Sequence, residues 1–285
     1  MTSYINWQFF IKKLLALVFI SLLSSYSSHS PAKEKHVFTV GVVPQFETKK
    51  LHRIWRPILD KLEQKTGYKF KLLGSPSISG FEKEFLVGKF DFAYMNPYHL
   101  AWSHKTIGYV PLVRDIKRSL YGVLVVRKDS PIKTPFELDG KKVAFPDPNA
   151  LGASLLIRAE LKKKFNITII PHYVKTHDSV YLNVALRQAD AGGGVQKTLD
   201  MQSDKIKNHL RIMYETEKVA AHPFSVHPRI DKIIHEKVRQ ALIEIGQEEE
   251  GKQLLKLVPI MEIGSASIED YLSLTNKGLE KFRSE

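Results

Sequence analysis

The sequence predicts an α/β protein built from two lobes that enclose a ligand site. Strand-like apolar runs alternate with segments of helical apolar spacing in two separate series. Each series contains one polar junction between a strand and a helix, DFAYMNPYHL (91–100) and THDSVYLNVALRQADAGGG (176–194). Because open α/β sheets bind ligands at such junctions, two of them predict a cleft between two lobes and capture of a small molecule.

The first series predicts a parallel sheet with covering helices. HVFTVGVVP (36–44) has the pattern of a strand that ends at Pro44. The helix predicted over 51–67 is apolar at positions three and four apart and stops at Gly67. A strand over 68–74, a helix over 78–89 and a strand over 90–95 complete the alternation.

The second series follows two β-rich segments, of which 119–129 is long enough to cross between lobes. LRIMYETE (210–217) is the predicted returning crossover, and two crossovers between two lobes form a hinged clamp. The remaining elements predicted here are a β-rich run over 109–116, strands over 141–146, 167–174 and 189–195, and helices over 150–165 and 177–188.

The C-terminal third predicts helices over 231–246, 248–258 and 266–282. Together these elements place lobe 1 at 33–118 plus 218–285 and lobe 2 at 119–217.

Residues 1–32 have the pattern of a signal peptide. Lys12 and Lys13 precede the apolar run LLALVFISLL (14–23), and small residues at Ser30 and Ala32 fit cleavage after Ala32. The alternative is an uncleaved anchor, although the run is short for a membrane span, which needs roughly 20 apolar residues. Either way we expect the body to be exported to the periplasm.

Composition excludes several classes of function. The chain has no cysteine, which excludes disulfides, Cys-ligated metals, Cys nucleophiles and a lipid anchor on an N-terminal cysteine. Its formal net charge of +13 is spread along the chain. Such a surface either steers anions or is simply solvated, and export argues against nucleic acid as the partner.

PDPNALGASLL (146–156) is the strongest candidate for an anion site. A helix that starts near Ala150 offers free backbone N–H groups, and the small residues around Leu151 let a ligand approach them. Asn149 either contacts the ligand or only caps this helix.

The two junctions supply the remaining candidates. His177 could donate to an anion or be structural, and Asp178 is expected to cap the following helix. Tyr94 and Asn96 follow a strand, where the alternatives to ligand contact are core packing and helix capping. Gly192–Gly194 either allows close backbone approach or forms a turn.

We expect no catalysis, cofactor or metal. The sequence contains no H-E-x-x-H, G-x-S-x-G or P-loop motif, and the histidine pairs His99/His104 and His172/His177 are five apart, which separates them around a helix.

These segments together resemble the phosphate/phosphite/phosphonate-binding proteins of ABC transporters, which are type II periplasmic binding proteins. The resemblance spans about 36–260. Its marks are GVVP (41–44), DFAYMNP (91–97), YGVLVVRKDSPI (121–132), FELDGKKVAFPDPN (136–149), THDSVYLNVALRQADAG (176–192) and HP (222–223). It implies two lobes, each a mostly parallel sheet flanked by helices, joined by two crossover strands, and a monomer that delivers its ligand to a membrane permease.

The resemblance also shows where this chain departs from the family. The Ser-Thr-Ser run that cradles the oxyanion corresponds to Ala150, Leu151 and Gly152, so the hydroxyls are gone and the backbone donors remain. The acids that hold an amine in some members correspond to Lys197 and His222, and a tyrosine position to Ile78. The resemblance therefore implies an anionic ligand without an amine.

The expected ligand site combines both arguments. Tyr94, Asn96 and Tyr121 are expected to shape one wall. The backbone of Ala150–Ser154, with His177, is expected to hold the anionic head, and Lys197 and His222 are secondary contacts. The set is Tyr94, Asn96, Tyr121, Asn149, Ala150, Leu151, Gly152, Ser154, His177, Asp178, Lys197 and His222. The alternatives are a ligand sensor for a membrane receptor kinase, an enzyme of the same fold class, and a scaffold that has lost ligand binding.

Overall fold

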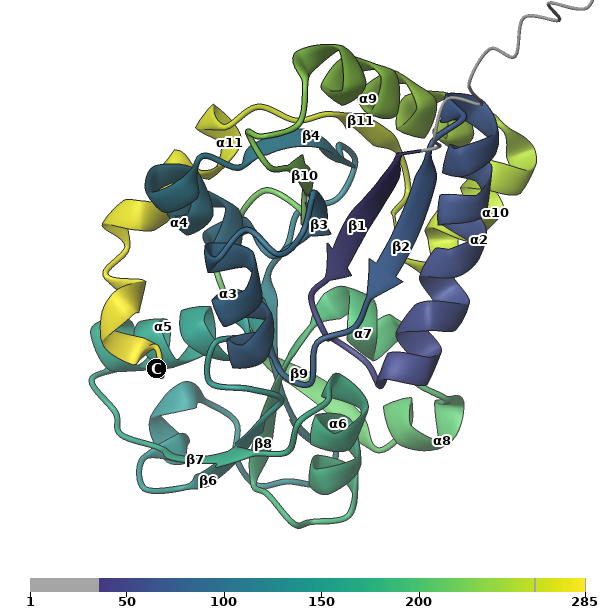
Figure 1. Ribbon diagram of the computed structural model, residues 1–285. Helices are drawn as coiled ribbons and strands as arrows, with labels where there is room; N and C mark the ends of the chain where they lie inside the picture. Colours follow the sequence, from purple (N-terminus) through teal and green to yellow (C-terminus); the bar gives the residue numbers. More distant parts are fainter. Residues whose placement is uncertain (1–35, 259, 285) are drawn as a thin grey trace, which may run out of the picture. The chain divides into compact units, whose positions relative to one another are not determined.

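The computed structural model describes residues 36–258 and 260–284, so the predicted signal peptide lies outside the described residues. Two mixed sheets organise the chain from Val37 onward (Figure 1). The first sheet has the order β11 (Ile263–Ser265), β4 (Val110–Asp115), β10 (Phe224–Val226), β3 (Phe92–Tyr94), β1 (Val37–Val42) and β2 (Lys69–Leu73). The second has the order β7 (Ile170–Tyr173), β6 (Lys142–Phe145), β8 (Ala191–Val195), β5 (Gly122–Arg127) and β9 (Leu210–Glu215).

Each sheet has a parallel part and an antiparallel part. β1 pairs in parallel with β2 and β3, and β6 pairs in parallel with β7 and β8. The strands next to the crossovers, β4, β5, β9 and β10, pair antiparallel. The sheets are therefore mixed, with more antiparallel pairing than the expected mostly parallel sheets.

Helices cover these sheets. The predicted amphipathic helix is α2 (Thr48–Thr66), which buries Ile54, Ile58 and Leu62 and ends at Gly67, whose φ is 74°. The remaining helical elements are α3 (Ile78–Leu86), α4 (Pro97–Ile107), η1 (Pro135–Leu138), η2 (Leu151–Leu156), α5 (Ile157–Phe165), α6 (His177–Ala185), α7 (Gln196–Asp200), α8 (Asp204–Lys207), α9 (Lys232–Gln247), α10 (Glu249–Leu257), α11 (Glu269–Leu272), η3 (Ser273–Asn276) and η4 (Leu279–Phe282).

Three predicted elements differ from the structure. The expected crossover over 210–217 is instead strand β9, and the connection back to the first sheet runs over 216–223 before β10. The expected helix over 266–282 is broken into α11, η3 and η4, and Gly278 has a φ of 63°. The expected α-helix from 150 begins as a π-helical segment, η2, and becomes α-helical at Ile157.

The two crossovers pair with each other. Leu120 and Val219 exchange both backbone hydrogen bonds, each 2.8 Å long, as an isolated antiparallel bridge. A narrow connection of this kind allows hinge motion between the two sheets. The exact lobe boundaries, after residues 118 and 217, remain a prediction.

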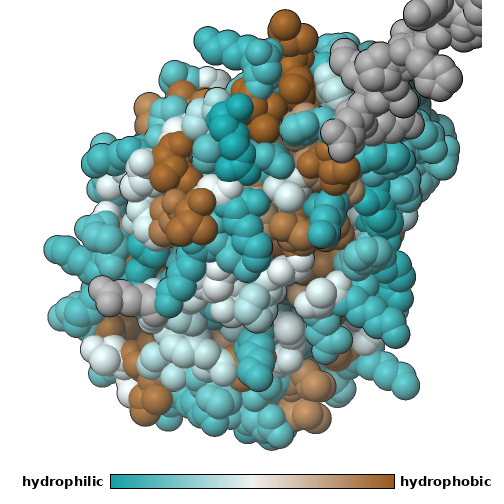
Figure 2. Space-filling view, viewed as in Figure 1, coloured by the Kyte–Doolittle hydropathy of each residue, from teal (hydrophilic) through white to brown (hydrophobic). Residues whose placement is uncertain are grey.

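The core of the first sheet extends into the second. Its hydrophobic cluster includes Leu151, Leu155 and Val195, which all come from the elements of the second sheet. Figure 2 shows hydrophilic residues over most of the viewed face, with hydrophobic residues in small separate groups. The C-terminal segment, yellow in Figure 1, runs from α11 down to α5.

Candidate functional site

A small cavity, here called the cleft cavity, lies where strands of both sheets end. Its walls include residues that follow β1, β3, β6 and β7 and the last residue of β8, which is the position that open α/β sheets use for ligands. Its volume is about 20 Å³, enough for about one water molecule. Its lining residues are Val43, Gln45, Ile78, Asn96, Ala150, Leu151, Gly152, Ala153, His177, Val195 and His222.

The cleft cavity brings together half of the predicted site residues. Asn96, Ala150, Leu151, Gly152, His177 and His222 line it. The other six predicted residues, Tyr94, Tyr121, Asn149, Ser154, Asp178 and Lys197, do not. Sequence reasoning missed Val43, Gln45 and Val195 as lining residues. The position of Val43–Gln45 just after a strand was the signal that could have found two of them.

The segment from 150 to 156 supplies backbone donors. Ser154 N and Leu155 N both donate to Ala150 O, at 2.9 and 3.0 Å. The N–H groups of Leu151, Gly152 and Ala153 have no acceptor in the part of the chain that the structure describes, as expected for the first turn of a helix. All three residues line the cleft cavity, so an anion there would meet up to three free N–H donors.

This segment packs tightly against the second sheet. A Cβ at Gly122 would lie 2.1 Å from Gly152 O, and one at Gly193 would lie 2.2 Å from Ala153 O. The glycine run therefore admits neighbouring backbone and side chains of this chain. The suggestion that it forms a turn is wrong, because Gly192–Gly194 lies inside β8.

Asn149 does not cap the helix that follows it. Ala150 is the N-cap residue, without a side-chain cap, and the Asn149 side chain points to other elements. Its Nδ2 donates to Glu82 Oε2 at 2.7 Å and to Ser284 O at 2.9 Å, and Ser284 N donates to its Oδ1 at 2.9 Å. Asn149 therefore joins α3 and the C-terminal segment to the end of β6.

Glu82 is the centre of a buried polar network. His99 Nε2 lies 2.9 Å from its Oε1, and Arg283 donates to its Oε2 at 3.1 Å. Burial alone would raise the pKa of Glu82, but the hydrogen bond from His99 and the charges of His99 and Arg283 hold it below its ordinary value. Glu82 is thus a buried carboxylate that relies on partners from several elements.

Asn96 caps α4, and helix capping was the predicted alternative to ligand contact for this residue. Its Oδ1 accepts from His99 N at 2.8 Å at the start of α4, and its Nδ2 lies 2.9 Å from His99 Nε2. Tyr94 packs in the core, where its ring stacks on His222 with centroids 5.4 Å apart. Asn96 therefore lines the cleft cavity directly, whereas Tyr94 lies behind the lining residue His222.

His177 is buried and electrically neutral. Burial lowers its pKa to about 4. Its Nδ1 lies 3.1 Å from Thr198 Oγ1, which is also within hydrogen-bonding distance of Tyr181 Oη and Val195 O. When the Thr198 hydroxyl donates to Nδ1, the imidazole carries its proton on Nε2 and becomes a donor.

Asp178 does not cap α6 either. Thr176 does so, with its Oγ1 accepting from Ser179 N at 3.1 Å. The Asp178 carboxylate instead forms an ion pair with Lys50 of α2 at 3.1 Å and accepts from Gln202 at 2.7 Å. It therefore links α6 to a helix of the first sheet.

His222 and Ser154 are occupied by neighbours within the chain. Burial lowers the pKa of His222 well below its ordinary value, so the ring is neutral and accepts from Gln45 Nε2 at 3.1 Å. Ser154 is fully buried, and its Oγ accepts from Arg158 Nε at 3.0 Å.

Lys197 and Tyr121 line a different hollow, of about 350 Å³, beside the two crossovers. Here we call it the hinge pocket. It adjoins the cleft cavity along the chain, because Val195 lines the cavity and Gln196 and Lys197 line the pocket.

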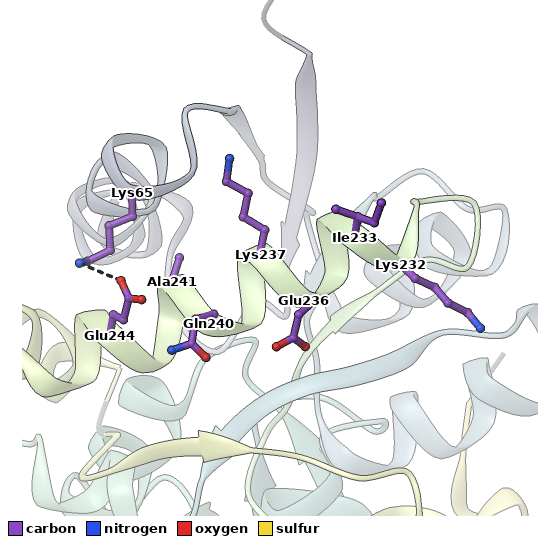
Figure 3. Close-up of a pocket in the computed structure, with 8 residues that line it drawn as sticks. All are labelled: Lys65, Lys232, Ile233, Glu236, Lys237, Gln240, Ala241 and Glu244. Atoms are coloured by element: carbon purple, nitrogen blue, oxygen red, sulfur yellow. Dashed lines mark hydrogen bonds and ion pairs between the residues drawn. The ribbon is translucent and has the colours of Figure 1, made fainter.

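A larger hollow, of about 600 Å³, lies on the surface between α2 and α9 (Figure 3). An ion pair of 3.3 Å between Lys65 and Glu244 crosses it, and both residues are labelled in Figure 3. It is remote from the strand ends that form ligand sites, so its size alone does not make it the candidate. In the described residues, no group of three or more His, Asp or Glu side chains is placed to hold a metal ion.

Comparison with known proteins identifies the family. Residues 40–271 match the family model for the periplasmic substrate-binding protein of phosphonate ABC transporters. The chain is 24% identical over 264 residues to the phosphonates-binding periplasmic protein of Escherichia coli K12, covering 86% of this chain and 78% of that protein. It is 21% identical to the phosphate-import protein PhnD of Mycolicibacterium smegmatis, covering 81% and 82%.

A solved structure shows the same fold. PhnD1 of Prochlorococcus marinus in complex with methylphosphonate matches with a TM-score of 0.77 and 13% identity, over 87% of this chain and 98% of that chain. The chain therefore has the two-lobed fold of the type II periplasmic binding proteins. It belongs to the family of periplasmic substrate-binding proteins of phosphonate ABC transporters. Its role is to bind a solute for delivery to such a transporter.

Between residues 36 and 284, Pro259 apart, no helix is both long and apolar enough to cross a membrane. Its curated relative from E. coli is named as a periplasmic protein. Cleavage of the predicted signal peptide remains a prediction.

Proposed function

We propose that this protein binds a phosphorus oxyanion that carries no amine and delivers it, as a monomer and without catalysis, to the permease of an ABC transporter. We also propose that export uses residues 1–32, which are then removed. We infer the class of ligand from the lining of the cleft cavity, which contains backbone donors and no carboxylate.

The donors suit an oxyanion. Three unpaired N–H groups at the start of η2 and the His177 ring surround one small space. A charge-assisted hydrogen bond contributes about 1.5–3 kcal/mol, so these donors can hold an oxyanion although positions 150–152 carry no hydroxyl.

The absence of acids argues against an amine. An ammonium group in the cleft cavity would have no carboxylate to balance it, since the lining consists of neutral residues. His222 contributes no positive charge there because burial keeps it neutral, so the repulsion of an ammonium group rests on Lys197 in the adjoining hinge pocket.

The volume of the cleft cavity requires movement. A space for about one water cannot hold a phosphonate, so binding needs the lobes to separate about the hinge and close again on the ligand. The paired crossovers at Leu120 and Val219 support such a hinge. A nucleophilic Ser, Thr or Cys is lacking in the cavity lining, which supports binding without chemistry.

A thermal-shift screen of the mature protein tests this proposal. The panel contains phosphate, phosphite, methylphosphonate, aminoethylphosphonate, sulfate and small carboxylates. A ligand at about 100 times its dissociation constant adds roughly 2.7 kcal/mol, which raises the melting temperature by several degrees. We expect a shift with a phosphorus oxyanion without an amine and none with aminoethylphosphonate.

One observation favours a second candidate, a scaffold that has lost ligand binding. The Leu151 side chain is buried in the hydrophobic cluster of the first sheet, where it helps to fill the space between the sheets. If no oxyanion in the panel shifts the melting temperature, this second reading replaces the first.

A further inference from the structure

The hinge pocket is formed across the two crossovers. Arg118 and Tyr121 come from one crossover, Lys218 from the other, and Lys197 from α7 of the second sheet. The backbone bridge between Leu120 and Val219 holds the two crossovers together at this point. The pocket volume of about 350 Å³ far exceeds that of the cleft cavity.

Positive charge dominates this pocket. Four cationic side chains line it against one carboxylate, Asp200, which already accepts from Gln196 Nε2 at 2.7 Å. The Arg118 guanidinium has no hydrogen bond or ion pair with any residue that the structure describes. The Lys218 ammonium lies over the Tyr121 ring, 5.3 Å from its centroid. These two cations are therefore free to bind an added anion.

Lys197 is a buried ammonium with a weak partner. Its side chain is 13% exposed, and its nearest carboxylate oxygen is Asp115 Oδ2 at 3.6 Å. That carboxylate is already used, because it accepts from the backbone N–H groups of Lys117, Arg118 and Met261 at 2.9–3.1 Å. Burial lowers the pKa of Lys197. A desolvated cation with so little compensation gains from an anion placed beside it.

We propose that the hinge pocket binds the phosphate or phosphonate group of a small ligand between Arg118, Lys197 and Lys218. This inference rests on the proposed function and adds to it a second anion site, beside the cleft cavity. The planar guanidinium of Arg118 suits bidentate contact with a tetrahedral oxyanion, and the two lysines add compact charges.

The volume and the lining indicate the rest of the ligand. A phosphorus oxyanion occupies only part of 350 Å³, so the pocket has room for an organic substituent against the Tyr121 ring. Because the cations come from both crossovers and from α7, an anion that binds all three also opposes a change in the hinge angle.

The test compares two double variants with the wild-type mature protein. Arg118→Gln with Lys218→Gln removes the two free cations and leaves the buried Lys197–Asp115 pair in place. Lys105→Gln with Lys256→Gln removes the same charge from exposed positions in α4 and α10. Calorimetric titrations use inorganic phosphate and methylphosphonate as separate probes at low salt. Backbone amide shifts at Ser119 and Tyr121, against those at Gly152 and Ala153, locate the bound anion.

We expect the hinge variant to bind at least one probe ten- to hundred-fold more weakly than the control variant, with amide shifts at Ser119 and Tyr121. Equal affinity of the two variants, with shifts confined to Gly152 and Ala153, overturns the hinge site and leaves the proposed function intact. If the wild-type protein binds neither probe, the proposed ligand class is wrong and the hinge site falls with it. A matching loss in the control variant also overturns the site, because net charge alone then explains binding.

Discussion

Asn149 Nδ2 donates a 2.7 Å hydrogen bond to Glu82 Oε2, and this bond joins the end of β6 to α3 across the cleft region. The two residues are 67 positions apart in the chain. The same asparagine binds Ser284 through both its amide and its carbonyl, so three segments that are distant in sequence meet at one buried side chain.

Loss of this bond destabilises the protein. Asn149→Ala leaves the Glu82 carboxylate with one fewer donor in a buried place, and we expect the free energy of unfolding to fall by about 1–3 kcal/mol. Asn208→Ala, at an exposed position after α8, is the matched control and changes it by less than about 0.5 kcal/mol. Urea unfolding followed by circular dichroism measures both. An equal change in the free energy of unfolding in the two variants would contradict a stabilising role for this hydrogen bond.

Arg283 stabilises the same carboxylate from the C-terminal segment. Its guanidinium donates to Glu82 at 3.1 Å and lies 3.8 Å from the centroid of the Trp102 ring. The folded-state pKa of Glu82 is lowered, so its contribution to stability is present above the unfolded pKa and is lost as pH falls through the folded value. Arg283→Gln raises that folded value, and we expect acid unfolding to begin at higher pH. An unchanged acid transition would contradict this role.

Burial of His177 gives the stability of the protein a second dependence on pH. Its folded-state pKa is lowered to about 4 by burial, so the unfolded chain binds a proton more readily between that value and about 6.5. The stability that neutral His177 confers is complete above about pH 6.5, and up to about 3 kcal/mol is lost as pH falls towards 4. His222 also has a lowered pKa, so the stability that depends on its neutral form is likewise lost as pH falls. We expect His177→Asn to flatten the melting-temperature profile over this range. A wild-type profile that is flat from pH 7 to pH 4 would refute the burial argument.

A serine in place of Leu151 is expected to increase the affinity for the ligand. Leu151→Ser enlarges the cleft cavity and adds a hydroxyl beside the free N–H groups of η2. We expect tighter methylphosphonate binding, by about tenfold or more, and a stability loss of about 2–5 kcal/mol from the removed apolar side chain. Leu155→Ala, also fully buried but outside the cavity lining, is the control for the packing loss alone. Titration calorimetry measures affinity, and a Leu151→Ser protein that binds no better than the control would refute the prediction.

Local patterns in the sequence predicted the elements whose burial is regular. The spacing of Ile54, Ile58 and Leu62 predicted α2, because each of these side chains faces the same sheet. The interval from 266 to 282 misled because its buried residues, Tyr271, Leu274 and Leu279, are spaced three and five apart and Gly278 interrupts them.

Long-range partners were beyond the reach of sequence patterns. Asn149 and Asp178 both stand where capping residues occur, yet Glu82 and Lys50 bind them instead. β10 has only three residues and pairs with β3 and β4, which lie more than 100 residues earlier in the chain, so no local periodicity reveals it. The cleft residues in the quoted motifs were found because strand ends are visible in sequence, whereas the hinge pocket depends on how three distant segments meet.

The most direct measurement is a pair of calorimetric titrations of the mature protein, with methylphosphonate and with aminoethylphosphonate. The two ligands share the oxyanion and differ by the amine. We expect methylphosphonate to bind and aminoethylphosphonate to bind at least tenfold more weakly, because no carboxylate lines the cleft cavity and Lys197 lies beside it. Tighter binding of aminoethylphosphonate would contradict the account, since it would require an acidic partner, and the lining of the cleft cavity contains none.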